Sequence, residues 1–167
     1  MSKNKGHTFF VMGVSGTGKS TIGKLLAKEL GLLFYDGDDY HPKANIAKMA
    51  AGIPLNDEDR HDWLISLHTI ALEHQNEGSV IACSALKKKY RALLNKGLNS
   101  FYFIFLEGSF EVILNRMKSR KDHFMPDVLL RSQFETLEIP DASENVIKVS
   151  IAHTPDQIIS EILKQLN

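Results

Sequence analysis

Two observations predict an α/β domain built on a mostly parallel sheet. Five short apolar runs, rich in β-branched and aromatic residues, are typical of buried strands. Segments with the apolar spacing of amphipathic helices lie between these runs. Strands that alternate with helices favour a parallel sheet covered on both faces, with ligands beyond the carboxyl ends of the strands. The length of 167 residues corresponds to a single domain, residues 1–167.

The elements follow one another without a repeat, a low-complexity tract or a linker. The predicted strands are Thr8–Met12, Leu32–Tyr35, Ser79–Cys83, Phe101–Leu106 and Val146–Ser150. The predicted helices are Lys19–Leu30, Asp57–Gln75, Phe110–Arg120, Asp127–Glu138 and Pro155–Leu166.

Composition excludes several classes of protein. Lys plus Arg and Asp plus Glu both number 20, so the formal net charge is zero and no overall field attracts nucleic acid or anionic lipid. No apolar run approaches the roughly 18 residues of a membrane helix, and the polar start of the chain is no convincing secretory signal. The single cysteine, Cys83, fits a reducing compartment. We therefore expect a soluble cytoplasmic protein without nucleic-acid or membrane partners.

A phosphate-binding loop follows the first predicted strand. The segment from Gly13 to Ser20, GVSGTGKS, matches G-x-x-x-x-G-K-[ST] at every position and leads into a predicted helix. Glycines let the chain wrap closely around a phosphate, so that backbone N–H groups and the helix N-terminus face the anion. Lys19 can reach the β- and γ-phosphates, and the Ser20 hydroxyl can bind Mg²⁺. The alternative, a glycine-rich turn, is poorly compatible with so complete a match.

Signals of a GTPase are missing. No Asp stands three residues before any Gly, and the segment Asn95–Leu98, NKGL, lacks the Asp that would bind guanine. A kinase for a small molecule is therefore favoured over a switch protein.

An acidic loop, Asp36–Pro42 (DGDDYHP), follows the second predicted strand on the same side of the sheet as the phosphate loop. In a kinase, one carboxylate here can hold a Mg²⁺-bound water and another can accept the proton of the attacking hydroxyl. The alternative is a solvated turn, in which Asp and Gly are common. His41 could bind a substrate hydroxyl or cap the turn before Pro42.

Arg60 stands near the start of a long predicted helix, where a cation is unfavourable. Asn56 or Asp57 is a good N-cap for this helix. An ordinary explanation for Arg60 is a local ion pair with Asp57 or Asp59. The functional explanation is that Arg60, with free backbone N–H groups, holds a substrate carboxylate.

Two further segments carry candidate residues. After the third predicted strand, small residues around Ser84 allow a ligand near the backbone, and Lys87 adds a cation, unless it is simply a solvated residue at a helix start. A basic cluster, Arg116–Lys121, contains Arg116 and Arg120 on one helix face. Such clusters are usually solvated, but in phosphoryl transfer arginines stabilise charge, and a mobile segment carrying them excludes water.

Together these motifs resemble the small P-loop gluconate kinases. The matching stretches are GVSGTGKST, DGDDYHP, GIPLNDEDRHDWL, CSALKKKYR and HFMPDVLLRSQFETLEIP, which span residues 13–140 in the order of that family. The resemblance implies a fold similar to nucleoside monophosphate kinases and shikimate kinase, with five parallel strands and a lid at about residues 117–135. It also implies transfer of phosphate from ATP, with Mg²⁺, to the 6-hydroxyl of D-gluconate, and a homodimer.

The resemblance also implies roles for single residues. The hypothesis is that Asp38 accepts the proton of the 6-hydroxyl, Lys19 neutralises the bridging oxygens, Asp36 with Ser20 holds Mg²⁺, and Arg60 binds the gluconate carboxylate. Arg120 is the third predicted catalytic residue, beside Lys19 and Asp38. The remaining substrate residues are His41, Ser84, Lys87, His123 and Gln133. The predicted nucleotide contacts are Gly13, Val14, Ser15, Gly16, Thr17, Gly18, Lys19, Ser20, Thr21 and Arg116.

Overall fold

A computed structural model describes residues 6–119 and 127–167 of the chain. Its five strands form one sheet with the order β2-β3-β1-β4-β5, and every neighbouring pair is parallel. The strands are β1 (Thr8–Met12), β2 (Leu33–Asp36), β3 (Ser79–Ala82), β4 (Phe101–Glu107) and β5 (Val146–Ser150). Thr8 of the central strand pairs with Ser79 on one side and Phe101 on the other. The predicted parallel α/β architecture is confirmed.

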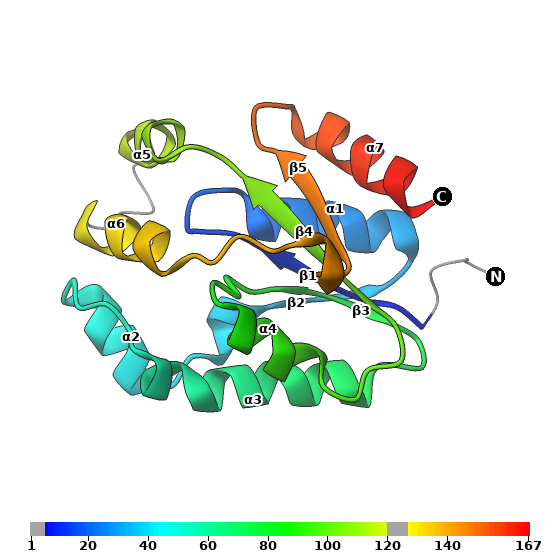
Figure 1. The fold of residues 1–167 in the computed structure, drawn as a ribbon, viewed down its shortest axis with the longest axis horizontal. Coiled ribbons are helices and arrows are strands. Elements are labelled where there is room, and N and C mark those ends of the chain that lie inside the picture. The colour runs from blue at the N-terminus through cyan, green and yellow to red at the C-terminus, as the bar shows by residue number, and fades with distance from the viewer. Residues whose placement is uncertain (1–5, 120–126) are drawn as a thin grey trace.

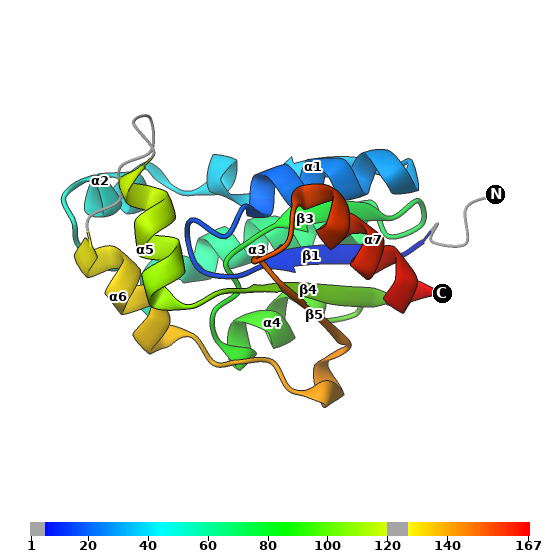
Figure 2. The same ribbon diagram turned by 90° about the horizontal axis from the view of Figure 1, so that it is seen from above.

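Helices lie on both faces of this sheet (Figure 1). On one face lie α1 (Lys19–Leu30) and α7 (Pro155–Leu166), and on the other α3 (Asp57–Glu73) and α4 (Lys88–Asn95). Three further helices lie beyond the carboxyl ends of the strands, as Figure 2 shows from a second direction: α2 (Lys43–Ala50), α5 (Phe110–Lys118) and α6 (Asp127–Thr136). Two 3₁₀ turns, Gly37–Tyr40 and Ala142–Glu144, complete the described elements. The edge where ligands are expected is thus surrounded by helical segments.

Two helices are not predicted by the apolar spacing. Helices α2 and α4 have eight residues each, which is only about two turns, and each contains two lysines. Such short segments show too few apolar repeats to stand out in a sequence. The start of α4 directly after Lys87 does agree with the alternative that Lys87 stands at a helix start. The other predicted elements occur, with ends shifted by one or two residues; Phe110–Arg120 is described only as far as Ser119.

The core lies on both sides of β1, all five residues of which are buried. Its largest members include Trp63, Phe9, Phe10 and Phe103, and the rings of Phe10 and Phe103 stack with centroids 5.0 Å apart. Continuous burial along β1 is expected for a parallel sheet that is covered on both faces. None of the described helices is long and apolar enough to span a membrane.

Candidate active site

The phosphate loop has the backbone conformation that its glycines permit. Gly13, Gly16 and Gly18 have φ values of +147°, +84° and +91°, and α1 begins directly after Gly18. A Cβ atom on Gly13 would stand 2.9 Å from the carbonyl oxygen of Leu106, so this position has no room for a side chain. The Thr17 hydroxyl donates to the Val14 carbonyl at 2.9 Å and fixes the loop from within. The loop is therefore shaped to present backbone N–H groups to an anion.

Ser20 and Asp36 join the phosphate loop to the acidic loop. The Ser20 hydroxyl donates to Asp36 Oδ2 at 2.6 Å, and the other carboxylate oxygen of Asp36 accepts from the Asp38 backbone N–H at 3.0 Å. Ser20 and Asp36 thus form a pair of oxygen donors of the kind that Mg²⁺ prefers. Burial lowers the pKa of the Lys19 ammonium, and the carboxylates of Asp38 and Asp36 oppose that shift.

His41 is held by a stack and a hydrogen bond. Its ring stacks on Trp63 with centroids 4.2 Å apart, while Trp63 Nε1–H donates to the Gly37 carbonyl at 2.7 Å. The side-chain amide of Asn45 donates to the Asp59 carbonyl at 2.8 Å and to His41 Nδ1 at 3.3 Å. A ring nitrogen that accepts from an amide carries no proton, so the proton of neutral His41 resides on Nε2. Burial also lowers the pKa of His41, which favours this neutral form.

Arg60 is buried near the start of α3, with only 7% of its surface exposed. Its Nη1 donates to the Tyr90 hydroxyl at 3.1 Å, and its guanidinium carbon lies 5.5 Å from the centre of the Tyr90 ring. A buried cation needs a partner, and this one borders a pocket.

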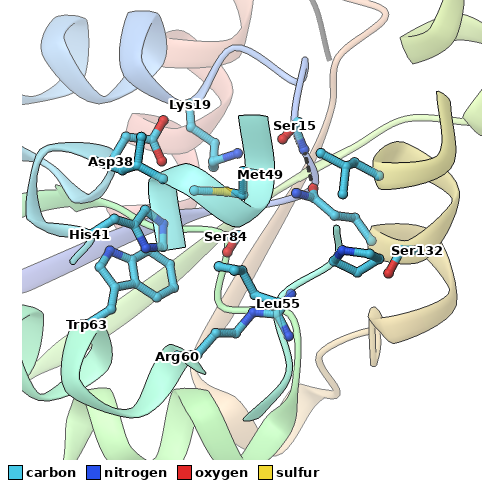
Figure 3. A pocket seen from close by; sticks show the side chains of 14 residues that line it. Ser15, Lys19, Asp38, His41, Met49, Leu55, Arg60, Trp63, Ser84 and Ser132 are labelled. Atoms are coloured by element: carbon cyan, nitrogen blue, oxygen red, sulfur yellow. Dashed lines mark hydrogen bonds between the residues drawn. The ribbon is translucent and has the colours of Figure 1, made fainter. Parts of the chain in front are cut away.

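The pocket has a volume of about 290 Å³ and combines residues from distant parts of the chain. In Figure 3, Ser15, Lys19 and Asp38 lie toward one end and Arg60 toward the other, with Met49 and Ser84 between them. The lining residues are Ser15, Lys19, Asp38, His41, Ile46, Met49, Pro54, Leu55, Arg60, Trp63, Ser84, Leu129, Ser132 and Gln133. One end can thus hold a phosphoryl group beside a carboxylate, and the other end can hold an anion.

Known proteins with this sequence pattern decide the family. The probable gluconokinase of Rattus norvegicus is 47% identical in an alignment 176 positions long, which covers 93% of this chain and 95% of that protein. The thermosensitive gluconokinase of Escherichia coli K12 is 50% identical, and that alignment covers 89% of this chain and 81% of that protein. This chain belongs to the gluconokinase family.

Two further comparisons agree with this gluconokinase assignment. A crystal structure of a gluconokinase from Sinorhizobium meliloti 1021 superimposes with a TM-score of 0.89 at 42% identity and covers 96% of this chain and 91% of that one. A family model described as shikimate kinase matches residues 15–167. The match to the shikimate kinase model reflects the broader fold and agrees with the similarity to shikimate kinase that the resemblance implies.

In this gluconokinase-family pocket, most of the predicted substrate residues come together. Asp38, His41, Arg60, Ser84 and Gln133 all line it. Gln133 also reaches the phosphate loop, where its Oε1 accepts from the Ser15 backbone N–H at 2.7 Å.

Other predicted residues lie elsewhere or outside the description. Lys87 forms an ion pair with Asp57 at 2.9 Å and does not line this pocket, so contact with a substrate there would require breaking that pair. Arg116 does not line the pocket either, and its Nη2 donates to the Ile151 carbonyl at 2.6 Å. Thr21 is exposed on α1. Arg120 and His123 lie outside the described residues.

The apolar lining of the pocket was not predicted from the sequence. Ile46 and Met49 come from α2, Pro54 and Leu55 from the segment after it, and Leu129 from α6. Trp63 comes from α3. The signal that could have found this part is the pair Ile46 and Met49, which lie three residues apart and so would share one face of a helix.

Proposed function

We propose that the chain transfers the γ-phosphoryl group of ATP to the 6-hydroxyl of D-gluconate, producing 6-phospho-D-gluconate and ADP. The observation that carries this proposal is the two-ended pocket, with the phosphate loop and Asp38 at one end and Arg60 at the other. An open-chain sugar acid has a hydroxyl at one end and a carboxylate at the other. Membership of the gluconokinase family selects gluconate among such acids.

The phosphate loop, Gly13–Ser20, binds the triphosphate through its backbone N–H groups. Lys19 moves from the Val14 carbonyl, to which it donates at 3.1 Å, to the phosphate oxygens. Ser20 and Asp36 would hold Mg²⁺, which neutralises charge on the phosphates when it is bound. Lys19 then adds a fixed positive charge beside the group that is transferred.

Asp38 is the proton acceptor in this mechanism. Both oxygens of Asp36 are occupied by Ser20 and the backbone of Asp38, whereas Asp38 is exposed and lines the pocket. Its carboxylate can therefore accept the proton of the 6-hydroxyl as the oxygen–phosphorus bond forms. This division of roles supports Asp38 over Asp36 as the base.

Arg60 binds the carboxylate of gluconate and so determines which end of the molecule meets ATP. His41, Ser84 and Gln133 offer polar atoms to the hydroxyl groups between the two ends. Trp63 and Leu55 exclude water from one side of the pocket.

Other features stay predictions from the sequence and the resemblance. They are the organisation as one domain with a lid at about residues 117–135, the roles of Arg116 in nucleotide binding, of Arg120 in catalysis and of His123 in substrate binding, the homodimer, and the cytoplasmic location. A lid over the phosphate end would exclude water during transfer.

A substrate screen with ATP tests the proposal. ADP release is measured with gluconate, shikimate, AMP and CMP, and the position of phosphate in the product is assigned by NMR. We expect turnover with gluconate and phosphate on its 6-oxygen. Preference for shikimate or a nucleotide would indicate another small-metabolite kinase, and ATP hydrolysis that no sugar acid changes would indicate a switch module.

A further inference from the structure

The two acidic residues beside Arg60 are occupied by other partners. Asp59 forms an ion pair with Lys48 at 2.8 Å and accepts from the Asn56 backbone N–H at 3.0 Å. In the described part of the chain, Arg60 makes no ion pair with Asp59 or Asp57. The ion pair of Arg60 with Asp57 or Asp59, which the sequence allowed, is thus replaced by pairs with lysines. The guanidinium of Arg60 borders the pocket instead.

Tyr90 of α4 stands between Arg60 and Asp57. Its ring is buried, with 4% of the residue exposed, and its hydroxyl donates to Asp57 Oδ1 while it accepts from Arg60 Nη1 at 3.1 Å. A phenol has one proton, so donating to Asp57 leaves its oxygen lone pairs free to accept from Arg60. The two hydrogen bonds therefore run in the same direction: Arg60 donates to Tyr90, and Tyr90 donates to Asp57.

Two lysines hold the outer end of this chain. Lys87 and Lys89 both form ion pairs with Asp57, and Lys87 also lies 5.7 Å from the centre of the Tyr90 ring. Hydrogen bonds from Lys89, Tyr90 and Lys87 keep the pKa of the Asp57 carboxyl far below its usual range. Asp57 is thus an anion whose charge is balanced on the surface, so that it orients Tyr90 without neutralising Arg60.

We propose that Tyr90 is a positioning residue that holds the guanidinium of Arg60 toward the substrate carboxylate, with Asp57 fixing the direction of the phenol. This inference rests on the proposed function, because it assumes that Arg60 binds the acid end of gluconate. It makes the junction of α3 and α4 the element that selects an acid over a neutral sugar derivative. Tyr90 itself touches Arg60 and Asp57 and does not line the pocket.

The test is Tyr90→Phe, which removes one hydroxyl and keeps the ring. We expect KM for gluconate to rise about 3- to 10-fold, which is within the range that a typical hydrogen bond contributes, with kcat and KM for ATP within about twofold. D-Gluconamide, which lacks the negative charge, is the second substrate. The value of kcat/KM for gluconamide should stay unchanged. The ratio of kcat/KM for gluconate to that for gluconamide should therefore fall by the same factor as kcat/KM for gluconate.

Tyr35→Phe is the matched control, because the Tyr35 hydroxyl contacts His74 at 3.0 Å and lies outside the pocket lining. It should change neither KM nor the ratio. If Tyr90→Phe is folded but leaves KM and the ratio unchanged, or lowers turnover of acid and amide equally, the inference is wrong. Should Tyr90→Phe fail to fold, Asp57→Asn tests the same contacts from their outer end with the same criteria. Absence of gluconate turnover in the unaltered protein would refute the proposed function itself, and this inference with it.

Discussion

Gln133 offers a sharp test of how the phosphate loop is used. Its side-chain oxygen accepts from the Ser15 backbone N–H at 2.7 Å, across 118 residues of chain. In a loop that cradles phosphate, this N–H is one of the groups that face the anion. The amide of Gln133 thus stands where a phosphate oxygen would accept, and ATP must displace it. Gln133→Ala should therefore tighten the binding of ATP in the absence of gluconate.

The size of this effect follows from the contact that is lost. A neutral hydrogen bond in a half-buried position contributes roughly 0.5–1.5 kcal/mol over the same groups in water. This hydrogen bond stabilises the unliganded protein, and it must break when ATP binds. The Gln133→Ala variant lacks the bond, so its binding of ATP carries no such cost. The dissociation constant of ATP should fall by about 2- to 12-fold. KM for gluconate should rise, because a polar group of the pocket is missing.

Isothermal titration calorimetry with a non-hydrolysable ATP analogue measures the first effect, and steady-state kinetics measure the second. Glu135→Ala is the matched control, since Glu135 is exposed on the same helix and does not line the pocket. It should leave both constants within about twofold. An ATP affinity that is unchanged or weaker in Gln133→Ala would refute the reasoning, because it would mean that Gln133 does not compete with phosphate for Ser15.

Three other changes have defined outcomes. Asp38→Asn should lower kcat by about 10²–10⁴-fold, because an amide cannot accept the hydroxyl proton; a loss below tenfold in the folded variant would remove Asp38 from that role. Gly37→Ala should lower the free energy of unfolding by about 1–3 kcal/mol, since its Cβ would overlap the Ala82 carbonyl oxygen, and urea unfolding that shows no loss would contradict this. The lowered pKa of His41 predicts that stability falls as pH decreases below about 6.5, because the unfolded chain then binds a proton that the folded chain resists. His41→Gln should flatten this part of a stability curve measured by urea unfolding, and an identical curve would exclude His41 as the cause.

The parts of the site that the sequence predicts are those formed by neighbouring residues. The phosphate loop is continuous from Gly13 to Ser20, and its function requires specific residue types at fixed spacing. Asp36 ends β2 and Asp38 follows it, and the parallel sheet brings the ends of its strands to one edge. Local chemistry and sheet geometry were enough to place these groups together.

Contacts between distant segments could not be predicted in this way. Lys87 was expected in the substrate pocket, yet it pairs with Asp57, 30 residues earlier in the chain. Nothing in a sequence shows which carboxylate a lysine will meet, because Lys is long and its ion pairs at a surface have little directional preference. The helix α2, which supplies Ile46 and Met49, was missed because about two turns of weakly apolar chain gain their helical stability from packing.

Arg60 and Arg91 show why a buried charge must be judged by its hydrogen bonds. Each is the fourth residue of its helix, and both are buried. Arg91 donates to both carboxylate oxygens of Glu144, at 2.7 and 3.4 Å, and to three backbone carbonyl oxygens, of Ala85, Leu86 and Glu138. A guanidinium has five N–H groups, and these contacts occupy them, so Arg91 ties loops together and has nothing left for a ligand. In the described part of the chain, Arg60 donates to Tyr90 and borders a pocket with its other N–H groups unassigned to protein. Since a buried cation without an anion is costly, this arrangement of Arg60 is the one that the proposed binding of a substrate carboxylate requires.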